Sequence, residues 1–234
     1  MMVMVAGVAV LLWASLLYWR SRQVVQIFDH SEQSSTRKKL GPESVPMLLR
    51  GLQHRDVLWR IESADMLRDL GPAAAPAVAA LCDALADADP RMRTAAAQAM
   101  REIGPKAADA VPHLIPLLRD PTTEVRYATI WALAAIHAQP DIAVPALIEP
   151  LKDEAQWIRF AACHALASYG TRAVAAVPQL TASLDDTIPQ VRLRAAEANC
   201  KITTDQPAAI AVLIDLLNEN IGAVHVLGNL GPRA

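Results

Sequence analysis

The chain contains few of the residues on which catalytic and metal sites usually depend. Its 234 residues include three cysteines without paired spacing, and six histidines that form neither a His-x-x-x-His nor a His-Glu pattern. It has no Gly-rich phosphate loop, no Cys-x-x-Cys-His haem motif and no Gly-x-Ser-x-Gly elbow. We therefore expect a protein that is not an enzyme and that has no cofactor and no metal site.

Aromatic residues and excess charge are also scarce. Aromatic residues make up 4% of the chain and hydrophobic residues 53%, so the interior is built from small and branched side chains that suit close helix packing. The formal net charge is −2 and the sequence pI is about 6.3. This balance argues against general polyanion binding, and we expect no nucleic-acid partner.

A repeat is the main positive feature of the sequence. A bulky apolar residue stands directly before an arginine five times, at intervals of 33 residues. The pairs are Trp59-Arg60, Met92-Arg93, Val125-Arg126, Ile158-Arg159 and Val191-Arg192. A period of this length predicts a stack of similar units, each of which buries its apolar face only against its neighbours.

Other columns in the same register predict two helices in each unit. Twelve residues before each arginine stands a leucine (Leu48, Leu81, Leu114, Leu147, Leu180), with a valine–proline or valine–alanine pair just ahead. Apolar residues also recur seven and ten residues after it, and Gly71, Gly104 and Gly170 follow the second helix. Apolar spacings of three and four with a closing glycine are typical of a helical hairpin capped in a left-handed conformation.

The motif Asp-x-x-x-x-Val-Arg-x-x-Ala-Ala-x-Ala-Leu-x-x-Ile-Gly, nearly intact over residues 87–104 and 120–136, carries a resemblance. It resembles HEAT-like repeats of the phycobilisome-lyase type over about residues 41–231. The resemblance implies an all-α, right-handed α-solenoid of about five to six helical hairpins. The first helix of each unit would lie outside, and the second would line the concave face.

Some positions depart from that pattern. His137 and Thr203 stand in place of the closing glycine, and Asn199 stands in place of a leucine, so we expect these positions to pack less well. The sixth unit aligns best if the loop after Leu217 has lost about five residues.

The first 19 residues differ from the repeats. They contain no charged side chain, and about 19 residues at about 1.5 Å each reach roughly the thickness of a bilayer core. A basic n-region and a cleavage site, which a signal peptide needs, are not apparent. We expect a transmembrane helix at 1–19, a linker at 20–40 and the repeat domain at 41–234. Basic residues only after the span place the repeats on the cytoplasmic side of a single-pass membrane protein.

Six residues before the last four arginines stands an aspartate (Asp87, Asp120, Asp153, Asp186). An aspartate in the interhelix turn can cap the second helix and accept hydrogen bonds from an arginine of the same or the adjacent unit. Because nearly every unit has the pair, we interpret it as a structural ladder along the stack.

The concave face is where the units differ. At about 100° per residue, positions +1, +2, +5 and +9 after the arginine point away from the core. The candidate binding residues there are Tyr127, Trp131, Phe160 and His164, with Asp65, Gln98 and Glu197 around them. We expect the first four to form one aromatic patch. The alternative is that the +1 residues pack beneath the next repeat.

Three functions are compatible with these observations. The favoured one is a membrane-anchored, non-enzymatic scaffold that binds a protein or peptide partner on the concave face. A bilin lyase or chaperone-like protein is the alternative that the resemblance implies. A DNA-glycosylase-like nucleic-acid binder is disfavoured, because the carboxylates of the first units would repel phosphates.

Overall fold

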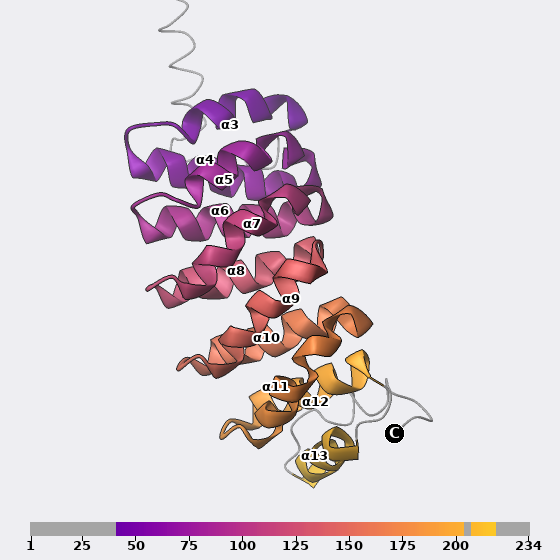
Figure 1. Ribbon diagram of the computed structural model, residues 1–234. Helices are drawn as coiled ribbons and strands as arrows, with labels where there is room; N and C mark the ends of the chain where they lie inside the picture. The colour runs from indigo at the N-terminus through magenta and orange to yellow at the C-terminus, as the bar shows by residue number, and fades with distance from the viewer. Residues whose placement is uncertain (1–40, 204–206, 219–234) are drawn as a thin grey trace, which may run out of the picture.

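The computed structural model describes residues 41–203 and 207–218, which form a single curved stack of helical hairpins (Figure 1). Long helices alternate with short segments that mix α and 3-10 turns. The long helices are α4 (Val57–Leu70), α6 (Pro90–Ile103), α8 (Thr123–Ile136), α10 (Gln156–Tyr169) and α12 (Pro189–Ile202). The described residues contain no β-strand.

The short segments complete each hairpin. They are η1 (Pro42–Ser44) with α3 (Val45–Gly51), η2 (Gly71–Ala77) with α5 (Val78–Ala84), η3 (Gly104–Ala110) with α7 (Val111–Leu114) and η4 (Ile115–Arg119), α9 (Pro140–Ile148) with η5 (Glu149–Lys152), η6 (Gly170–Ala176) with α11 (Val177–Ala182) and η7 (Ser183–Asp185), and α13 (Pro207–Asn218). Pro116 and Pro150 stand in the first turns of η4 and η5, where a missing amide donor helps to end the preceding α-helix.

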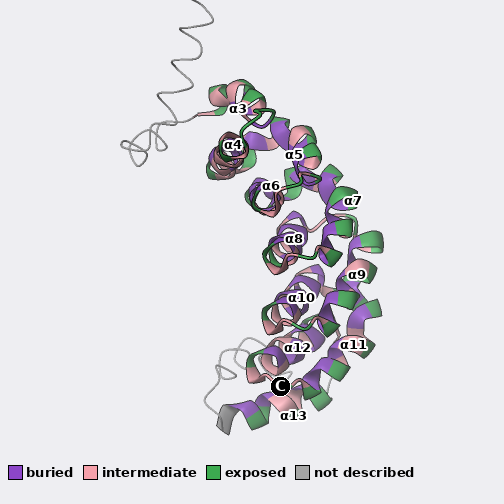
Figure 2. Ribbon diagram, turned by 90° about the vertical axis from the view of Figure 1, so that its left-hand side faces the viewer, coloured by how far each residue is buried: buried purple, intermediate pink, exposed green. Residues whose placement is uncertain are grey.

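The two sets of helices form two layers. Figure 2 shows α4, α6, α8, α10 and α12 side by side on the inner side of the arc, with α5, α7, α9 and α11 on the outer side. The expected placement of the second helix of each unit on the concave side is thus confirmed. We call the exposed side of the five inner helices the concave face.

The core lies between these layers and follows the predicted columns. The five leucines twelve residues before the arginines (Leu48, Leu81, Leu114, Leu147, Leu180) are all buried. So are the residues seven after the first four arginines (Leu67, Met100, Leu133, Leu166). The remaining interior is rich in alanine, which lets neighbouring inner helices approach closely.

The predicted transmembrane helix at 1–19 and the linker at 20–40 lie outside the described residues. Within residues 41–203 and 207–218, no helix is both long and apolar enough to cross a bilayer. The predicted end of the sixth unit, after α13, also lies outside the described part of the chain.

The closing glycines adopt a backbone conformation that side chains disfavour. Gly71, Gly104 and Gly170 have φ between 55° and 67° with ψ near −135°, the lowest value being −140°. This differs from the left-handed cap that we expected, because ψ lies on the opposite side of zero. The positive φ explains why glycine recurs there.

His137 replaces this glycine without leaving a poorly packed end, so the expectation was wrong there. It takes a left-handed conformation (φ 53°, ψ 32°), and Tyr169 of the next unit packs edge-on to its ring, 4.9 Å between centroids. The Tyr169 hydroxyl lies within hydrogen-bond distance of the carbonyls of Leu133 (3.1 Å) and Ala138 (3.2 Å). The Leu133 carbonyl also accepts from the backbone N–H of His137 (3.0 Å), so the hydroxyl links the last turn of α8 to the next unit.

The other two departures are also accommodated. Asn199 is fully buried, but its side-chain amide donates to the carbonyl of Ala195 (3.0 Å) and its oxygen accepts from Thr181 (3.4 Å). Thr203 continues past α12 in an extended conformation, and its hydroxyl donates to the carbonyl of Asn199. Burial of the amide is therefore compensated by hydrogen bonds.

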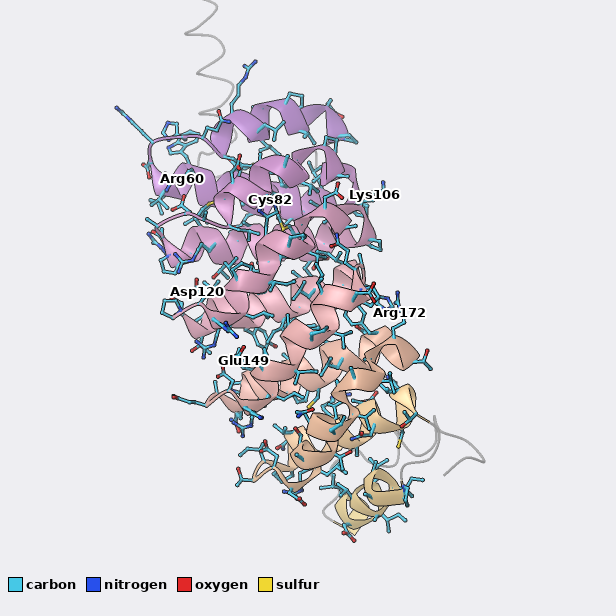
Figure 3. The ribbon with its side chains drawn as sticks, viewed as in Figure 1. Arg60, Cys82, Lys106, Asp120, Glu149 and Arg172 are labelled. Carbon is cyan, nitrogen blue, oxygen red and sulfur yellow. The ribbon has the colours of Figure 1, made fainter. Side chains whose placement is uncertain are left out.

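The predicted ladder is present and runs between adjacent units. Arg60, Arg93, Arg126 and Arg159 each donate through Nε and Nη2 to both carboxylate oxygens of an aspartate 27 residues later, at 2.6–3.1 Å. The aspartates are Asp87, Asp120, Asp153 and Asp186. Figure 3 places Arg60 and Asp120 along one edge of the stack and Arg172 on the other.

Each ladder group also holds its own interhelix turn. Nη1 of Arg126 donates to the carbonyl of Asp120 (2.9 Å), and the Asp120 carboxylate accepts from the backbone N–H of Thr122 (2.9 Å). Thr122 is the N-cap residue of α8, so Asp120 fixes the turn before the helix and does not cap the helix itself. Burial alone would raise the pKa of Asp120, but the bonds from Arg93 and Thr122 lower it below its ordinary value.

We predict that Arg126→Ala lowers the free energy of unfolding by about 1 to 3 kcal/mol, because it leaves Asp153 without its charge-assisted bonds. Arg119→Ala is the matched control. Arg119 also pairs with a carboxylate, Glu149, but its side chain is 76% exposed, so we expect no measurable change. Urea unfolding followed by circular dichroism measures both; equal effects would contradict the assignment.

Candidate functional site

The predicted patch lies on α8 and α10, in the middle of the concave face. The rings of Tyr127 and Trp131 meet edge-on at 6.0 Å between centroids, and Trp131 contacts His164 of the next unit at 4.7 Å. Two cations flank the group: the Arg101 guanidinium lies 5.5 Å from the Trp131 ring, and that of Arg194 lies 5.1 Å from Phe160. The structure therefore joins Tyr127, Trp131 and His164 into one cluster across two units.

Burial within this cluster is uneven. Tyr127 is 39% exposed, whereas Trp131 and Phe160 are half-buried and pack against the core. The interpretation of the +1 residues as packing is thus correct for Phe160 and incorrect for Tyr127. The Trp131 indole N–H is buried and has no hydrogen-bond partner among the described residues. A truncation of Trp131 would therefore remove core packing as well as groove surface.

The expected exposure of the +2 column was wrong in the middle units. Ala95, Ala128 and Ala161 are buried, because this side of each inner helix faces the neighbouring inner helix. The small side chain allows the close approach of α6, α8 and α10. In the end units this column holds Glu62 and Arg194, which are half-buried.

The exposed side of the inner helices includes another column, which stands two residues before the arginines. At about 100° per residue, this column points within about 20° of the +5 column. It contains Leu58 and Trp157, which are 60% and 61% exposed. Sequence reasoning missed both, although the same helical geometry would have identified them. Trp157 extends the aromatic surface of α10 toward the interhelix turn.

Charged side chains occupy the two ends of the concave face. At α4, Asp65 and Asp69 pair with Arg68 at 2.6 Å and 3.6 Å, and Arg68 also donates to Gln98 of α6 (3.1 Å). At α12, Glu197 accepts from Arg194 (2.5 Å) and Lys201 (2.7 Å). Burial would raise the pKa of Glu197, but hydrogen bonds from Lys201 and Arg194 lower it below its ordinary value.

Reactive groups and metal ligands are not gathered in the described residues. Burial raises the pKa of all three thiols, that of Cys163 to about 12, so they stay protonated and poorly nucleophilic. Cys163 is buried, while Cys82 and Cys200 are half-buried. No group of three or more His, Cys, Asp or Glu side chains in the described ranges could hold a metal ion.

A cleft of about 710 Å³ opens between the interhelix turns of the third and fourth units, away from the aromatic cluster. Two ion pairs join charged residues of its lining, Arg119 with Glu149 and Arg126 with Asp153. The lining contains no histidine or cysteine. The concave face is the stronger candidate because the aromatic residues gather there.

Two family models match the repeat region of the sequence. HEAT repeats match residues 111–199 and 144–225, and the PBS lyase HEAT-like repeat matches residues 92–120. The chain is a HEAT-like repeat protein. No curated protein matches its sequence.

Solved structures with the same architecture agree with this assignment. The complex of CpcE and CpcF of phycocyanin lyase from Nostoc sp. is 28% identical to this HEAT-like repeat protein, with a TM-score of 0.65, and the match covers 82% of this chain and 78% of that one. An engineered protein is 25% identical (TM-score 0.60; 80% and 88% covered). A designed armadillo repeat protein in complex with the peptide (KR)4 is 20% identical (TM-score 0.60; 81% and 92% covered) and shares the fold.

Two histidines predict a pH dependence of stability. Burial, followed by the nearby Arg194, lowers the pKa of His164, and burial with Arg172 lowers that of His137. In the unfolded HEAT-like chain both would titrate near about 6.5, so the unfolded state binds more protons below that pH. We expect stability to fall as pH drops from 7 to 5, above the range in which carboxylates titrate.

Urea midpoints measured between pH 5 and pH 7 test this expectation. The double variant His137→Gln/His164→Gln should flatten the slope over this interval, whereas substitution of the exposed His113 should leave it as in the parent. A slope that persists in the double variant would assign the pH dependence to other groups.

Proposed function

We propose that this HEAT-like repeat protein is a membrane-anchored, non-enzymatic scaffold whose concave face holds a protein or peptide partner. The observation that carries the proposal is the concentration of aromatics at the centre of that face. Tyr127, Trp131, Trp157 and Phe160 lie on two adjacent inner helices, although aromatic residues are only 4% of the chain. Aromatic anchors surrounded by polar groups are typical of the energetic centre of an interface.

The side chains around the aromatic cluster are better suited to binding a partner than to catalysing a reaction. The described thiols are protonated, and the histidine in the cluster is held toward its neutral form by burial. The His164 ring packs against Trp131, and no carboxylate of the described residues is hydrogen-bonded to it as an orienting partner would be to a typical catalytic base. A partner bound there would be held by apolar contact, cation–π contact and charge.

Membrane anchoring is the second part of the proposal, and its support comes from the sequence of residues 1–19. This stretch has no charged side chain, and the basic residues follow it. We predict that the full chain sediments with membranes and resists extraction at high salt, and that protease added to sealed cells spares the repeats. Recovery of the intact chain in the soluble fraction would refute the anchor, and digestion of the repeats would reverse the orientation.

A bilin lyase or chaperone-like role is the alternative. It is favoured by the 28% identity to the complex of CpcE and CpcF of phycocyanin lyase. Incubation of the purified chain with a linear tetrapyrrole separates the two roles. A lyase or bilin chaperone would change the visible absorption of the pigment, and Tyr127→Ala would reduce the change. An unchanged spectrum with the parent chain favours the scaffold.

For the scaffold, we predict that Tyr127→Ala and Trp157→Ala change the melting temperature little, since the two side chains are 39% and 61% exposed, yet weaken partner capture by about 2 kcal/mol or more. Gln179→Ala, on the outer helix α11, should alter neither property. Proteins retained from a lysate by the parent chain are compared with those retained by each variant. If the Tyr127→Ala and Trp157→Ala variants retain the same proteins as the parent chain, the aromatic residues serve packing and do not bind a partner.

A further inference from the structure

Two aromatic rings of the concave face are each covered by an arginine of the adjacent helix. The Arg101 guanidinium of α6 lies 5.5 Å from the centroid of the Trp131 ring on α8, and that of Arg194 on α12 lies 5.1 Å from Phe160 on α10. Both guanidinium groups also pair with a carboxylate of their own helix. These carboxylates are Glu102 (3.5 Å) and Glu197 (2.5 Å). The face therefore contains the same combination twice: an aromatic ring, a guanidinium and a carboxylate.

The two most exposed aromatic rings of α8 and α10 lack the guanidinium. Tyr127 and Trp157 are 39% and 61% exposed, and within residues 41–203 and 207–218 no arginine or lysine lies over either ring. A carboxylate stands beside them. Glu124 is exposed on α8, and its side chain forms no ion pair or hydrogen bond with the described residues. The described chain thus supplies the rings and the carboxylate of the combination, but no guanidinium.

Helix geometry brings Glu124, Tyr127 and Trp157 to one place. Glu124 and Tyr127 are three residues apart on α8, so their side chains lie on one face with Cβ atoms about 5–6 Å apart. Trp157 occupies on α10 the position that Glu124 occupies on α8. The two helices pack side by side (Figure 2), with axes about 8–10 Å apart. This spacing admits a side chain of another molecule that contacts both rings and the carboxylate.

The other charged groups around this point are compensated. On α6, Arg91 occupies the position equivalent to Glu124 and is exposed, but its guanidinium donates to both carboxylate oxygens of Asp89 at 2.7–3.3 Å. The remaining charged groups nearby balance in number: the ladder pairs, Arg119 with Glu149, and Lys152 against Glu154. Glu124 therefore leaves one negative charge in excess beside the two exposed rings.

We propose that Glu124, Tyr127 and Trp157 form a site for an arginine side chain of the partner protein. This inference rests on the proposed function and adds the chemistry of the partner at the centre of the concave face. A guanidinium is planar, so it stacks on an aromatic ring while it donates two parallel hydrogen bonds to a carboxylate. The compact ammonium of lysine offers no planar face for stacking. A partner carboxylate at this point would be repelled by Glu124.

Fluorine NMR of the full chain in a non-ionic detergent tests the site. Tryptophan is replaced by fluorinated tryptophan, and the Trp157→Phe variant assigns the signal of Trp157. N-acetyl-arginine methylamide is the probe, and the citrulline compound, which has nearly the same shape without the charge, is the matched control at constant ionic strength. We expect the Trp157 signal to shift at least about threefold more per amount of arginine compound than of citrulline compound. The lysine compound should give a smaller shift than the arginine compound.

A substitution of the carboxylate locates the site in the protein. Glu124→Gln removes the charge with little change of shape, and it should reduce the arginine response about threefold without altering the citrulline response. Glu43→Gln makes the same change on η1 and should have no effect. Melting temperatures are measured as well, because a carboxylate in the first turn of α8 also suits the positive end of that helix. A lower melting temperature with an unchanged arginine response would assign Glu124 to the helix alone and overturn the site.

The outcomes separate this inference from the proposed function. The arginine site is refuted if the arginine, lysine and citrulline compounds act equally, if none acts, or if Glu124→Gln acts no more than Glu43→Gln. In those cases the scaffold still stands when Tyr127→Ala loses partners in the capture experiment. If the arginine response depends on Glu124 but Tyr127→Ala and Trp157→Ala retain the same proteins as the parent chain, the arginine site stands and the proposed function is refuted.

Discussion

The stack depends on one interaction, the two-pronged hydrogen bond from an arginine of each unit to an aspartate of the next. The four pairs have side chains that are only 8–20% exposed, so each is shielded from water and from salt. Every arginine also holds the carbonyl of its own turn, as Arg93 holds that of Asp87 (2.8 Å). The ladder therefore fixes the turn within a unit and its register on the next unit, which apolar contacts between alanine-rich helices leave less well defined.

Much of this architecture could be predicted because repetition averages out local ambiguity. A single Val-Arg pair says little, but five at one spacing identify the buried columns, and the leucines at those columns are all buried. The repeat did not predict which side of each inner helix packs against its neighbours. The +2 alanines are buried because neighbouring inner helices pack against that side of each helix, a contact that the pattern of one helix does not contain.

The end of α8 shows why departures from a repeat are harder to interpret. Comparison of one column predicts a defect at His137, because a side chain replaces a glycine. The compensation comes from another column in the next unit, where Tyr169 stands in the place of Leu70 and Ile103 and donates its hydroxyl to the end of α8. Considered without His137, Tyr169 is a polar residue in an apolar column. Its burial raises the pKa of its hydroxyl to about 12. Only the pair explains both departures.

The same reasoning separates structure from function on the concave face. A departure that is buried and paired with a second departure, as at His137 and Tyr169, preserves the stack. A residue that departs from the repeat and remains exposed, such as Tyr127 or Trp157, leaves part of an apolar side chain in contact with water in the described structure. Such surface is costly in water unless another molecule covers it. Because the ladder sets the register of each inner helix on the next, this surface is preorganised, and a partner would lose little affinity to reorganisation of the protein.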